Sequence, residues 1–113
     1  MTALTKDDHD RYQRQLIIPA IGEEGQEKLK EARVLVTGAG GLGSPVLMYL
    51  AAAGVGTIGI VDSDTVSMSN LQRQVLYVTG DIGRVKAEAA AERISLLNPL
   101  IKILHYPVRL TVE

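Results

Sequence analysis

Six consecutive residues have the spacing of a phosphate-binding turn. They read Gly38-Ala39-Gly40-Gly41-Leu42-Gly43 and match the pattern G-x-G-x-x-G. Glycines let the backbone turn tightly and approach a phosphate chain, while free amides at a helix start offer donors near the positive end of the helix dipole. The turn therefore predicts phosphate binding by Gly38, Gly40, Gly41 and Gly43. The other interpretation is that these glycines serve only the close packing of a helix on a sheet.

An acid follows at the distance expected for a ribose contact. Asp62 lies 24 positions after Gly38, and in nucleotide-binding βαβ units an acid about 20 residues beyond the glycine turn accepts hydrogen bonds from ribose hydroxyls. We therefore expect a ligand that contains a ribose. Asp62 would otherwise be a residue that starts the turn after its strand. The pattern does not separate a dinucleotide from ATP.

Two cations are expected at the same place. Arg73 lies in a long connection, and Lys86 lies at the start of a predicted helix. The carboxyl ends of parallel strands and the following helix starts share one edge of the sheet, so the glycine turn, Asp62, Arg73 and Lys86 should converge on one crevice. Cations there would stabilise charge that develops on phosphate oxygens. Taken singly, Arg73 would be a solvated loop residue and Lys86 a helix-surface residue.

These residues require alternating strands and helices to position them. The β-branched and apolar runs 33–37, 57–61 and 101–105 predict strands, and 33–37 is expected to be a buried parallel strand. Turn residues and apolar spacing predict helices over 7–16, 23–32, 45–53 and 84–97. Segment 63–83 has no strong period, and a connection of that length is often functional.

The predicted fold class is α/β, a Rossmann-like parallel sheet with crossover helices, preceded by two N-terminal helices. We expect residues 1–32 to form an N-terminal helical segment and residues 33–113 to form the first half of a Rossmann-like domain. Because the chain stops just after a strand, we interpret it as a partial domain.

Composition excludes several classes of partner. The 113 residues carry 12 Lys and Arg against 13 Asp and Glu, so no net field attracts nucleic acid or an anionic membrane. The absence of cysteine excludes disulfides and thiol chemistry within the chain, and a reducing cytoplasm is the expected location. The charge-free stretch 34–61 is long enough to span a bilayer, but its seven glycines and Pro45 favour strand, turn, helix, turn and strand.

Further motifs occur in order along the chain. They are RYQRQ at 11–15, GEEGQ at 22–26, the glycine turn, DSDTVSMSNLQRQ at 62–74, DIGRVK at 81–86 and LNP at 97–99. This series resembles the ThiF/MoeB/HesA family, the bacterial relatives of ubiquitin-activating enzymes, over nearly the whole chain from Arg11. The glycines alone are a weak signal, whereas D-x-D, S-N-L-Q-R-Q and G-R-x-K in this order are highly specific.

The resemblance implies an adenylyltransferase. Its reaction would be the ATP-dependent adenylation, with Mg²⁺, of the C-terminal glycine of a small ubiquitin-like sulfur carrier of the thiamin or molybdopterin synthesis type, with release of pyrophosphate. Gly41 and its neighbours would contact the nucleotide, Asp62 the ribose, and Asp64 would sit beside the phosphates. The resemblance assigns phosphate contacts to Asn70, Arg73 and Lys86, and it adds Ser69, Leu71 and Gln72 to the nucleotide-binding residues.

Arg14 resembles the family arginine that enters the active site of the other subunit in a homodimer. Arg14 also shares a helical face with Arg11, so an ordinary surface position is the alternative.

Two departures from the family pattern limit these expectations. Val85 stands where many members have proline, which loosens the predicted position of Lys86. The family's second magnesium-binding acid, its zinc-binding cysteines and the thioester-forming cysteine of many members lie downstream of these residues. We therefore assign no metal site here, expect Zn²⁺ only in a C-terminal part, and expect this fragment to be inactive alone.

Competing functions remain open from the sequence. A nicotinamide- or flavin-dependent oxidoreductase uses the same glycine turn and acid, a non-enzymatic binding or dimerisation module is the third possibility, and a peptide is an alternative to the carrier protein.

Overall fold

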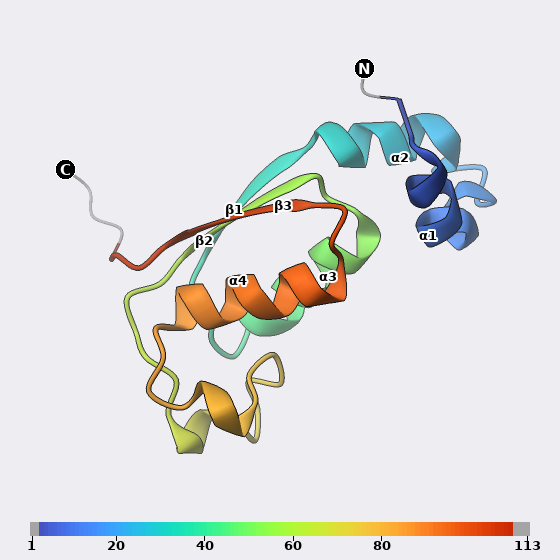
Figure 1. Ribbon diagram of the computed structural model, residues 1–113. Coiled ribbons are helices and arrows are strands. Elements are labelled where there is room, and N and C mark those ends of the chain that lie inside the picture. Colours follow the sequence, from blue (N-terminus) through green and yellow to red (C-terminus); the bar gives the residue numbers. More distant parts are fainter. Residues whose placement is uncertain (1–2, 110–113) are drawn as a thin grey trace.

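Three short runs of β-branched and apolar residues form the sheet of this protein, whose computed structural model describes residues 3–109 (Figure 1). They are β1 (Arg33–Thr37), β2 (Thr57–Val61) and β3 (Lys102–Tyr106), in the spatial order β1-β2-β3 and all parallel. Thr57 is paired with Arg33 on one side and with Lys102 on the other. The predicted strands and their parallel arrangement are confirmed, with β3 one residue later than expected.

Two crossover helices, α3 (Gly43–Ala53) and α4 (Lys86–Leu97), cover the same face of this sheet (Figure 1). Ile58 and Ile60 of β2 point into that layer and are fully buried. Small alanines on α4 bring the helix close to the strands, and Leu47 of α3 completes the core. The α/β fold with crossover helices is therefore confirmed.

The prediction that β1 is a buried strand is wrong. Its residues alternate between exposed and half-buried, and Leu35 is 55% exposed. The reason is that no described element covers the second face of the sheet, where Leu35, Leu104 and Tyr106 line a shallow groove. A continuous apolar run indicates a strand that can be buried on both faces, but burial depends on what packs against it.

The helix boundaries differ slightly from those predicted. α3 begins at Gly43 rather than Pro45 and ends as expected at Gly54, whose φ of 94° is left-handed. α4 begins at Lys86 rather than Arg84, because Val85 stays extended and bridges antiparallel to Thr65. The connection between β2 and α4 is not wholly irregular, since it contains two 3₁₀ turns, η1 (Met68–Asn70) and η2 (Thr79–Asp81).

The N-terminal helices α1 (Lys6–Leu16) and α2 (Gly22–Glu31) lie beyond the end of the sheet (Figure 1). Buried amide side chains attach them: Gln26 Nε2 donates to the Ala53 carbonyl at 2.9 Å, and Asn98 Nδ2 donates to the Tyr12 hydroxyl and to the Ala51 carbonyl, each at 2.7 Å. These contacts are made at the C-terminal end of α3.

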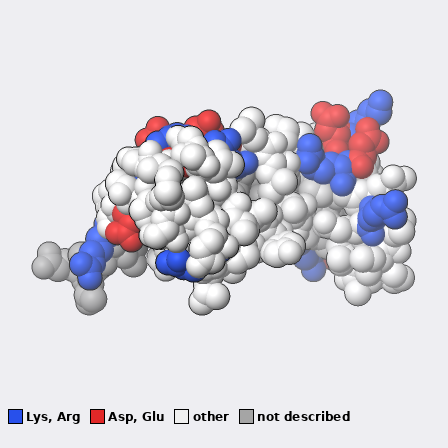
Figure 2. All heavy atoms as spheres, turned by 90° about the horizontal axis from the view of Figure 1, so that it is seen from below, with Lys and Arg blue, Asp and Glu red and all other residues white. Residues whose placement is uncertain are grey.

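Charged side chains gather toward the two ends of the molecule in Figure 2, and a broad area without charge lies between them. α3, which carries no charged residue, contributes exposed Val46 and Tyr49 to the surface, and Leu42, just before the helix, is exposed as well. Within residues 3–109, no helix combines the length and apolar character needed to cross a membrane.

Candidate nucleotide-binding site

The glycine turn joins the end of β1 to the start of α3. Gly38 adopts a left-handed φ of 88°, and its amide donates to the Val61 carbonyl at 2.8 Å, which holds the turn against the end of β2. At the other end of the turn, a Cβ on Gly43 would collide with the carbonyl of Gly38. These two glycines are therefore required by the backbone itself.

Gly41 is different, and this difference bears on the packing interpretation. An added Cβ there would meet no atom within 4 Å, and its φ is not left-handed. Neither packing nor conformation within residues 3–109 requires glycine at this exposed position. Open space beside a bare backbone is what the close approach of a ligand requires, so packing accounts for Gly43 but not for Gly41.

The turn presents a run of unpaired donors. Within the described part of the chain, the amides of Gly40, Gly41, Leu42 and Gly43 donate to no protein acceptor. They lie at the start of α3, a helix of 11 residues, where the helix dipole favours negative charge. This arrangement fits a phosphate group.

Asp62 ties the turn to the segment that follows β2. One carboxylate oxygen accepts the Ala39 amide at 2.7 Å, and the other accepts the Asp64 amide at 2.7 Å. Asp62 therefore does start a turn. Since each carboxylate oxygen can accept two hydrogen bonds and accepts one here, acceptor capacity remains for ribose hydroxyls. Asp62 also lines a shallow pocket of about 230 Å³ together with Gly38 and Asp64.

The backbone of Lys86 is hydrogen-bonded to the rim of the site, which is formed by the glycine turn, Asp62 and Asp64. Its amide donates to the Asp64 carbonyl at 2.8 Å, so hydrogen bonds connect the glycine turn, Asp62, Asp64 and Lys86 in series. The helix-surface interpretation of Lys86 is wrong, because the residue is 6% exposed. None of the ion pairs formed within residues 3–109 includes its ammonium group. Lys86 is thus a mostly buried lysine without an ion-pair partner in the described chain, and its ammonium group is available to an anionic ligand.

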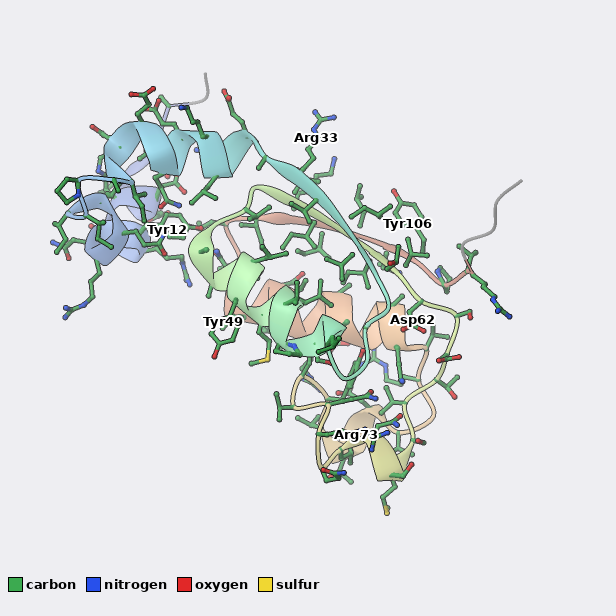
Figure 3. The ribbon with its side chains drawn as sticks, turned by 180° about the vertical axis from the view of Figure 1, so that it is seen from behind. Tyr12, Arg33, Tyr49, Asp62, Arg73 and Tyr106 are labelled. Carbon is green, nitrogen blue, oxygen red and sulfur yellow. The ribbon has the colours of Figure 1, made fainter. Side chains whose placement is uncertain are left out.

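Arg73 lies in the loop between β2 and α4, on the side of the molecule where Asp62 lies (Figure 3). It is exposed and donates to the Ser69 carbonyl at 3.0 Å. The next residue, Gln74, is buried and packs its amide against Gly40. The loop therefore folds back onto the glycine turn at Gln74, the residue next to Arg73.

The other predicted residues of this loop have mixed surroundings. Ser69 and Gln72 are exposed, whereas half-buried Leu71 packs against the hydrophobic core. The Asn70 side-chain oxygen accepts the Ser67 amide at 3.1 Å and the Ser67 hydroxyl at 3.0 Å, which leaves its NH₂ group available. Asp64 keeps an exposed carboxylate. Within residues 3–109, no cluster of three His, Asp or Glu side chains could hold a metal.

The structure does not bring Arg14 to the glycine turn of its own chain. Arg14 is exposed on α1, next to Gln15, whose Nε2 donates to the Ala53 carbonyl at 3.0 Å. Ala53 ends α3 and Gly43 begins it, so the length of this helix, about 16 Å, separates the two positions.

Sequence reasoning assigned no role to four residues that hold the site in place, although two of them, Gln74 and Asp81, belong to the motifs at 62–74 and 81–86. Ser44 and Tyr77 donate from their hydroxyls to the Ala39 carbonyl, and Gln74 packs beneath Gly40. Burial, and then the negative charge of Asp62, raise the pKa of the Tyr77 hydroxyl well above its ordinary value. Tyr77 therefore stays protonated and remains a donor.

The fourth of these residues, Asp81, anchors the end of the loop before Lys86. It is 1% exposed and accepts from Arg93 Nε at 3.2 Å, Arg93 Nη2 at 3.1 Å, Arg84 Nη1 at 3.2 Å and the Val78 amide at 2.9 Å. Burial raises the pKa of this carboxyl, but the hydrogen bonds, that from Arg93 foremost, outweigh burial and place the pKa below its ordinary value.

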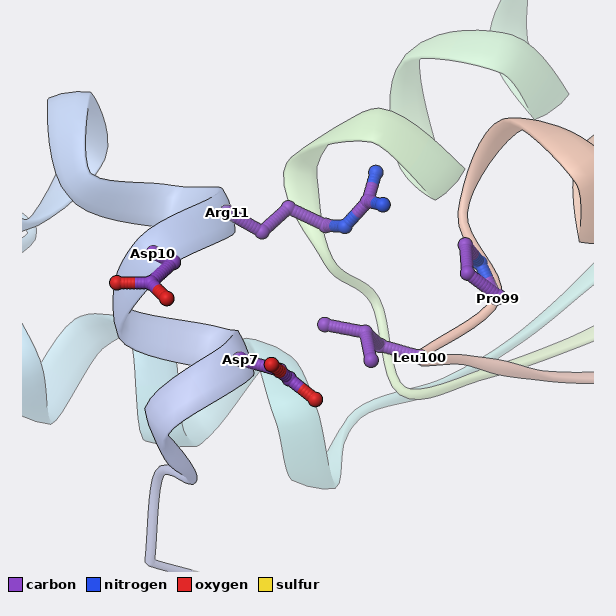
Figure 4. A pocket seen from close by; sticks show the side chains of 5 residues that line it. All are labelled: Asp7, Asp10, Arg11, Pro99 and Leu100. Atoms are coloured by element: carbon purple, nitrogen blue, oxygen red, sulfur yellow. The ribbon is translucent and has the colours of Figure 1, made fainter.

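A larger hollow, of about 540 Å³, lies between α1 and the segment before β3 (Figure 4). Asp7 and Asp10 line it with carboxylates, and Arg11 donates to the Leu97 carbonyl at 3.2 Å. Two carboxylates repel phosphate, so the chemistry favours the glycine turn over this larger hollow.

The family of the chain is decided by its match to a known family model. The ThiF family model matches residues 12–113. The chain belongs to the ThiF family. Curated relatives include the sulfur carrier protein adenylyltransferase of Thermus thermophilus, 60% identical over 109 residues that cover 96% of this chain and 40% of that protein. The probable adenylyltransferase/sulfurtransferase MoeZ of Mycobacterium tuberculosis is 58% identical over 109 residues, 96% of this chain and 28% of that protein.

Solved structures agree with this ThiF assignment. E. coli TcdA, a tRNA N6-threonylcarbamoyladenosine dehydratase solved in complex with ATP, superposes with a TM-score of 0.90 at 29% identity over 97% of this chain and 44% of that chain. E. coli MccB, solved with MccA-N7isoASN, has a TM-score of 0.81 at 33% identity over 89% of this chain and 31% of that chain. This ThiF chain thus spans less than half the length of each of these proteins.

Proposed function

We propose that this ThiF-family chain binds ATP at the glycine turn and takes part in the adenylation of a carboxylate. One observation carries the proposal: the unpaired amides from Gly40 to Gly43 lie on the same rim as Asp62 and the buried, unpaired Lys86. Donors and a cation without protein partners fit a triphosphate, and the acid fits a ribose. The names of the curated relatives and the ATP complex of TcdA support this assignment.

The reaction joins a carboxylate to the α-phosphorus of ATP. A carboxylate oxygen attacks this phosphorus, the bond from it to the bridging oxygen of the β-phosphate breaks, and pyrophosphate leaves. The nucleophile is already ionised at neutral pH, so the protein need not supply a base. The turn amides, Lys86 and Arg73 would stabilise the charge on the phosphate oxygens, and Arg73 must release the Ser69 carbonyl to do so.

Mg²⁺ would arrive with ATP. The exposed carboxylate of Asp64, next to Asp62 on the rim, is suited to binding the ion or its water molecules. When bound, the positive charge of Mg²⁺ would offset the negative charge of the triphosphate.

The acceptor that we propose is the C-terminal glycine carboxylate of a small ubiquitin-like sulfur carrier, of the thiamin or molybdopterin type. The sulfur-carrier relative in Thermus thermophilus supports a protein acceptor. The MccB structure with MccA-N7isoASN supports the peptide alternative. A cytoplasmic location is proposed with this function, since a chain without cysteine has no disulfide that an oxidising compartment would favour.

We also propose a homodimer in which Arg14 reaches the site of the second subunit. Two observations support it: Arg14 lies the length of α3 away from its own glycine turn, and Val46 and Tyr49 are exposed on the uncharged helix α3. Apolar patches on a surface mark sites of association. Light scattering tests this proposal, and a monomer at the concentration of the activity assay would remove the trans role of Arg14.

Pyrophosphate exchange into ATP tests the proposed activity in the full-length enzyme with its carboxylate acceptor. Arg73→Ala should lower the exchange rate at least tenfold, whereas Arg33→Ala, on the exposed edge of β1, should leave it unchanged. Unchanged exchange in Arg73→Ala would remove this residue from the mechanism. The oxidoreductase alternative is tested by thermal shift, in which ATP with Mg²⁺ should stabilise the protein and NAD should not.

A further inference from the structure

The backbone of Ala39 is held by three side chains, at its amide and at its carbonyl. The Asp62 carboxylate accepts its amide at 2.7 Å, while the Ser44 hydroxyl, at 3.0 Å, and the Tyr77 hydroxyl both donate to its carbonyl. Ala39 and Ser44 are fully buried, and Tyr77 is 4% exposed. The residue after β2, helix α3 and the long loop therefore each contribute a side chain that fixes one residue of the glycine turn.

This arrangement determines where the Gly40 amide points. The Ala39 carbonyl and the Gly40 N–H belong to one planar peptide unit, and no cis bond occurs in the described chain. In a trans unit the two groups point in opposite directions. Because two hydroxyls hold the carbonyl toward the interior, the Gly40 N–H is directed to the outer side of the turn, where it has no protein acceptor.

We propose that Tyr77 is a positioning residue for the phosphate site: its hydroxyl, together with that of Ser44, keeps the Gly40 amide directed at the bound anion. The inference rests on the proposed function, since the anion is the phosphate chain of ATP. Tyr77 touches no ligand in this role. It acts through the peptide unit between Ala39 and Gly40.

A glycine turn needs such a restraint. Gly40 has no Cβ and tolerates many backbone conformations, so a peptide rotation between Ala39 and Gly40 meets little steric resistance from Gly40. Tyr77 also couples the turn to the loop that carries Arg73: its amide donates to the Gln74 carbonyl at 3.2 Å, and Gln74 packs on Gly40. The donor and the cation of the site are thus placed by one segment.

Tyr77→Phe tests the inference, and Tyr12→Phe is its matched control. Both tyrosines are 4% exposed, and each hydroxyl has a hydrogen bond, that of Tyr12 with Asn98 Nδ2 at 2.7 Å. Both variants of the full-length protein should lose stability to urea to a similar extent. Tyr77→Phe should also weaken ATP binding about fivefold to tenfold, the effect of one misdirected hydrogen bond, while Tyr12→Phe should change it by less than about twofold.

The amide chemical shift of Gly40 is a second measurement, and a loss of stability in a protein that is still folded does not by itself change it. In Tyr77→Phe the ¹H–¹⁵N signal of Gly40 should shift in the free protein and respond less to ATP, whereas in Tyr12→Phe it should match the native signal. If Tyr77→Phe does not fold, Ser44→Ala removes the second hydroxyl from the same carbonyl and should produce the same shift.

Two results would overturn the inference: a native Gly40 resonance in folded Tyr77→Phe, or equal weakening of ATP binding by both tyrosine variants. Failure of the proposed function has a different signature, because then the native protein itself does not bind ATP. The Gly40 resonance of the free protein still decides the role of Tyr77 in that case.

Discussion

Replacing Gly41 and Gly43 separately by alanine distinguishes a ligand-binding role from a packing role within one turn. The two positions are two residues apart, yet an added Cβ meets no atom within 4 Å at Gly41 and collides with the Gly38 carbonyl at Gly43. Gly41→Ala should therefore fold normally and weaken ATP binding. Gly43→Ala should lose stability before any effect on binding is considered.

The sizes of the two effects follow from these contacts. A methyl group at Gly41 would keep a phosphate from the turn amides, and losing one or two charge-assisted hydrogen bonds, each about 1.5 kcal/mol, weakens binding roughly tenfold to a hundredfold. The free energy of unfolding should stay the same or rise by up to about 1 kcal/mol, because alanine restricts the unfolded chain. At Gly43, overpacking against a backbone carbonyl should cost about 2 kcal/mol.

Urea unfolding and equilibrium binding of ATP with Mg²⁺ measure both quantities on the same samples of full-length protein. The native protein is the reference, and Gly80→Ala, also an exposed glycine of this chain with no atom within 4 Å of an added Cβ, controls for a general effect of such a change. Native ATP affinity in a folded Gly41→Ala variant would refute the reasoning that its open space serves a ligand. A loss of stability as large as that of Gly43→Ala would refute it as well.

Two further predictions concern the residues around the turn. Lys86→Met removes a buried cation that has no ion-pair partner in residues 3–109, so stability should hold or rise while ATP affinity falls at least about tenfold, measured by the same urea and binding assays. Asp81→Asn should cost about 2 kcal/mol at pH 7 in urea unfolding, because the charge-assisted hydrogen bonds from Arg93 are weakened or lost, whereas exposed Asp10→Asn should cost little. The folded pKa of Asp81 lies below its ordinary value of 3.8, so its contribution is present above that pH and lost as pH falls through the lowered pKa. Native stability should therefore decline below about pH 4, and a decline equally steep in Asp81→Asn would contradict the assignment to Asp81.

The local sequence was sufficient for the elements and for much of the site. Apolar runs separated by glycines placed all three strands to within a residue, and Gly54 marked the end of α3, because these signals depend on neighbours in the chain. The shared edge of parallel strands also predicted that Asp62 and Lys86 would join the glycine turn, and hydrogen bonds through Asp64 connect them. The roles of the individual residues toward a nucleotide stay predictions.

The failures have a common cause. The burial of β1 was overestimated because a run of valine and leucine shows what a strand tolerates and not which faces are covered. Lys86 was predicted as a site residue, but its burial was not, because burial depends on neighbours in space that no periodicity reports. Tyr77 gave no signal at all, because its contact with Ala39 spans 38 positions.

The sequence by itself determined the order of strands and helices, the position of the glycine turn and the family of the chain, since each of these follows from short motifs at fixed spacing. The tertiary structure alone decided which donors of the turn stay unpaired and that Lys86 is mostly buried without an ion-pair partner in the described chain. It also decided which distant side chains orient the peptide unit between Ala39 and Gly40. The physical reason is that hydrogen-bond pairing and burial are properties of the neighbours in space, and the long connection between β2 and α4 sets those neighbours by folding back on the turn.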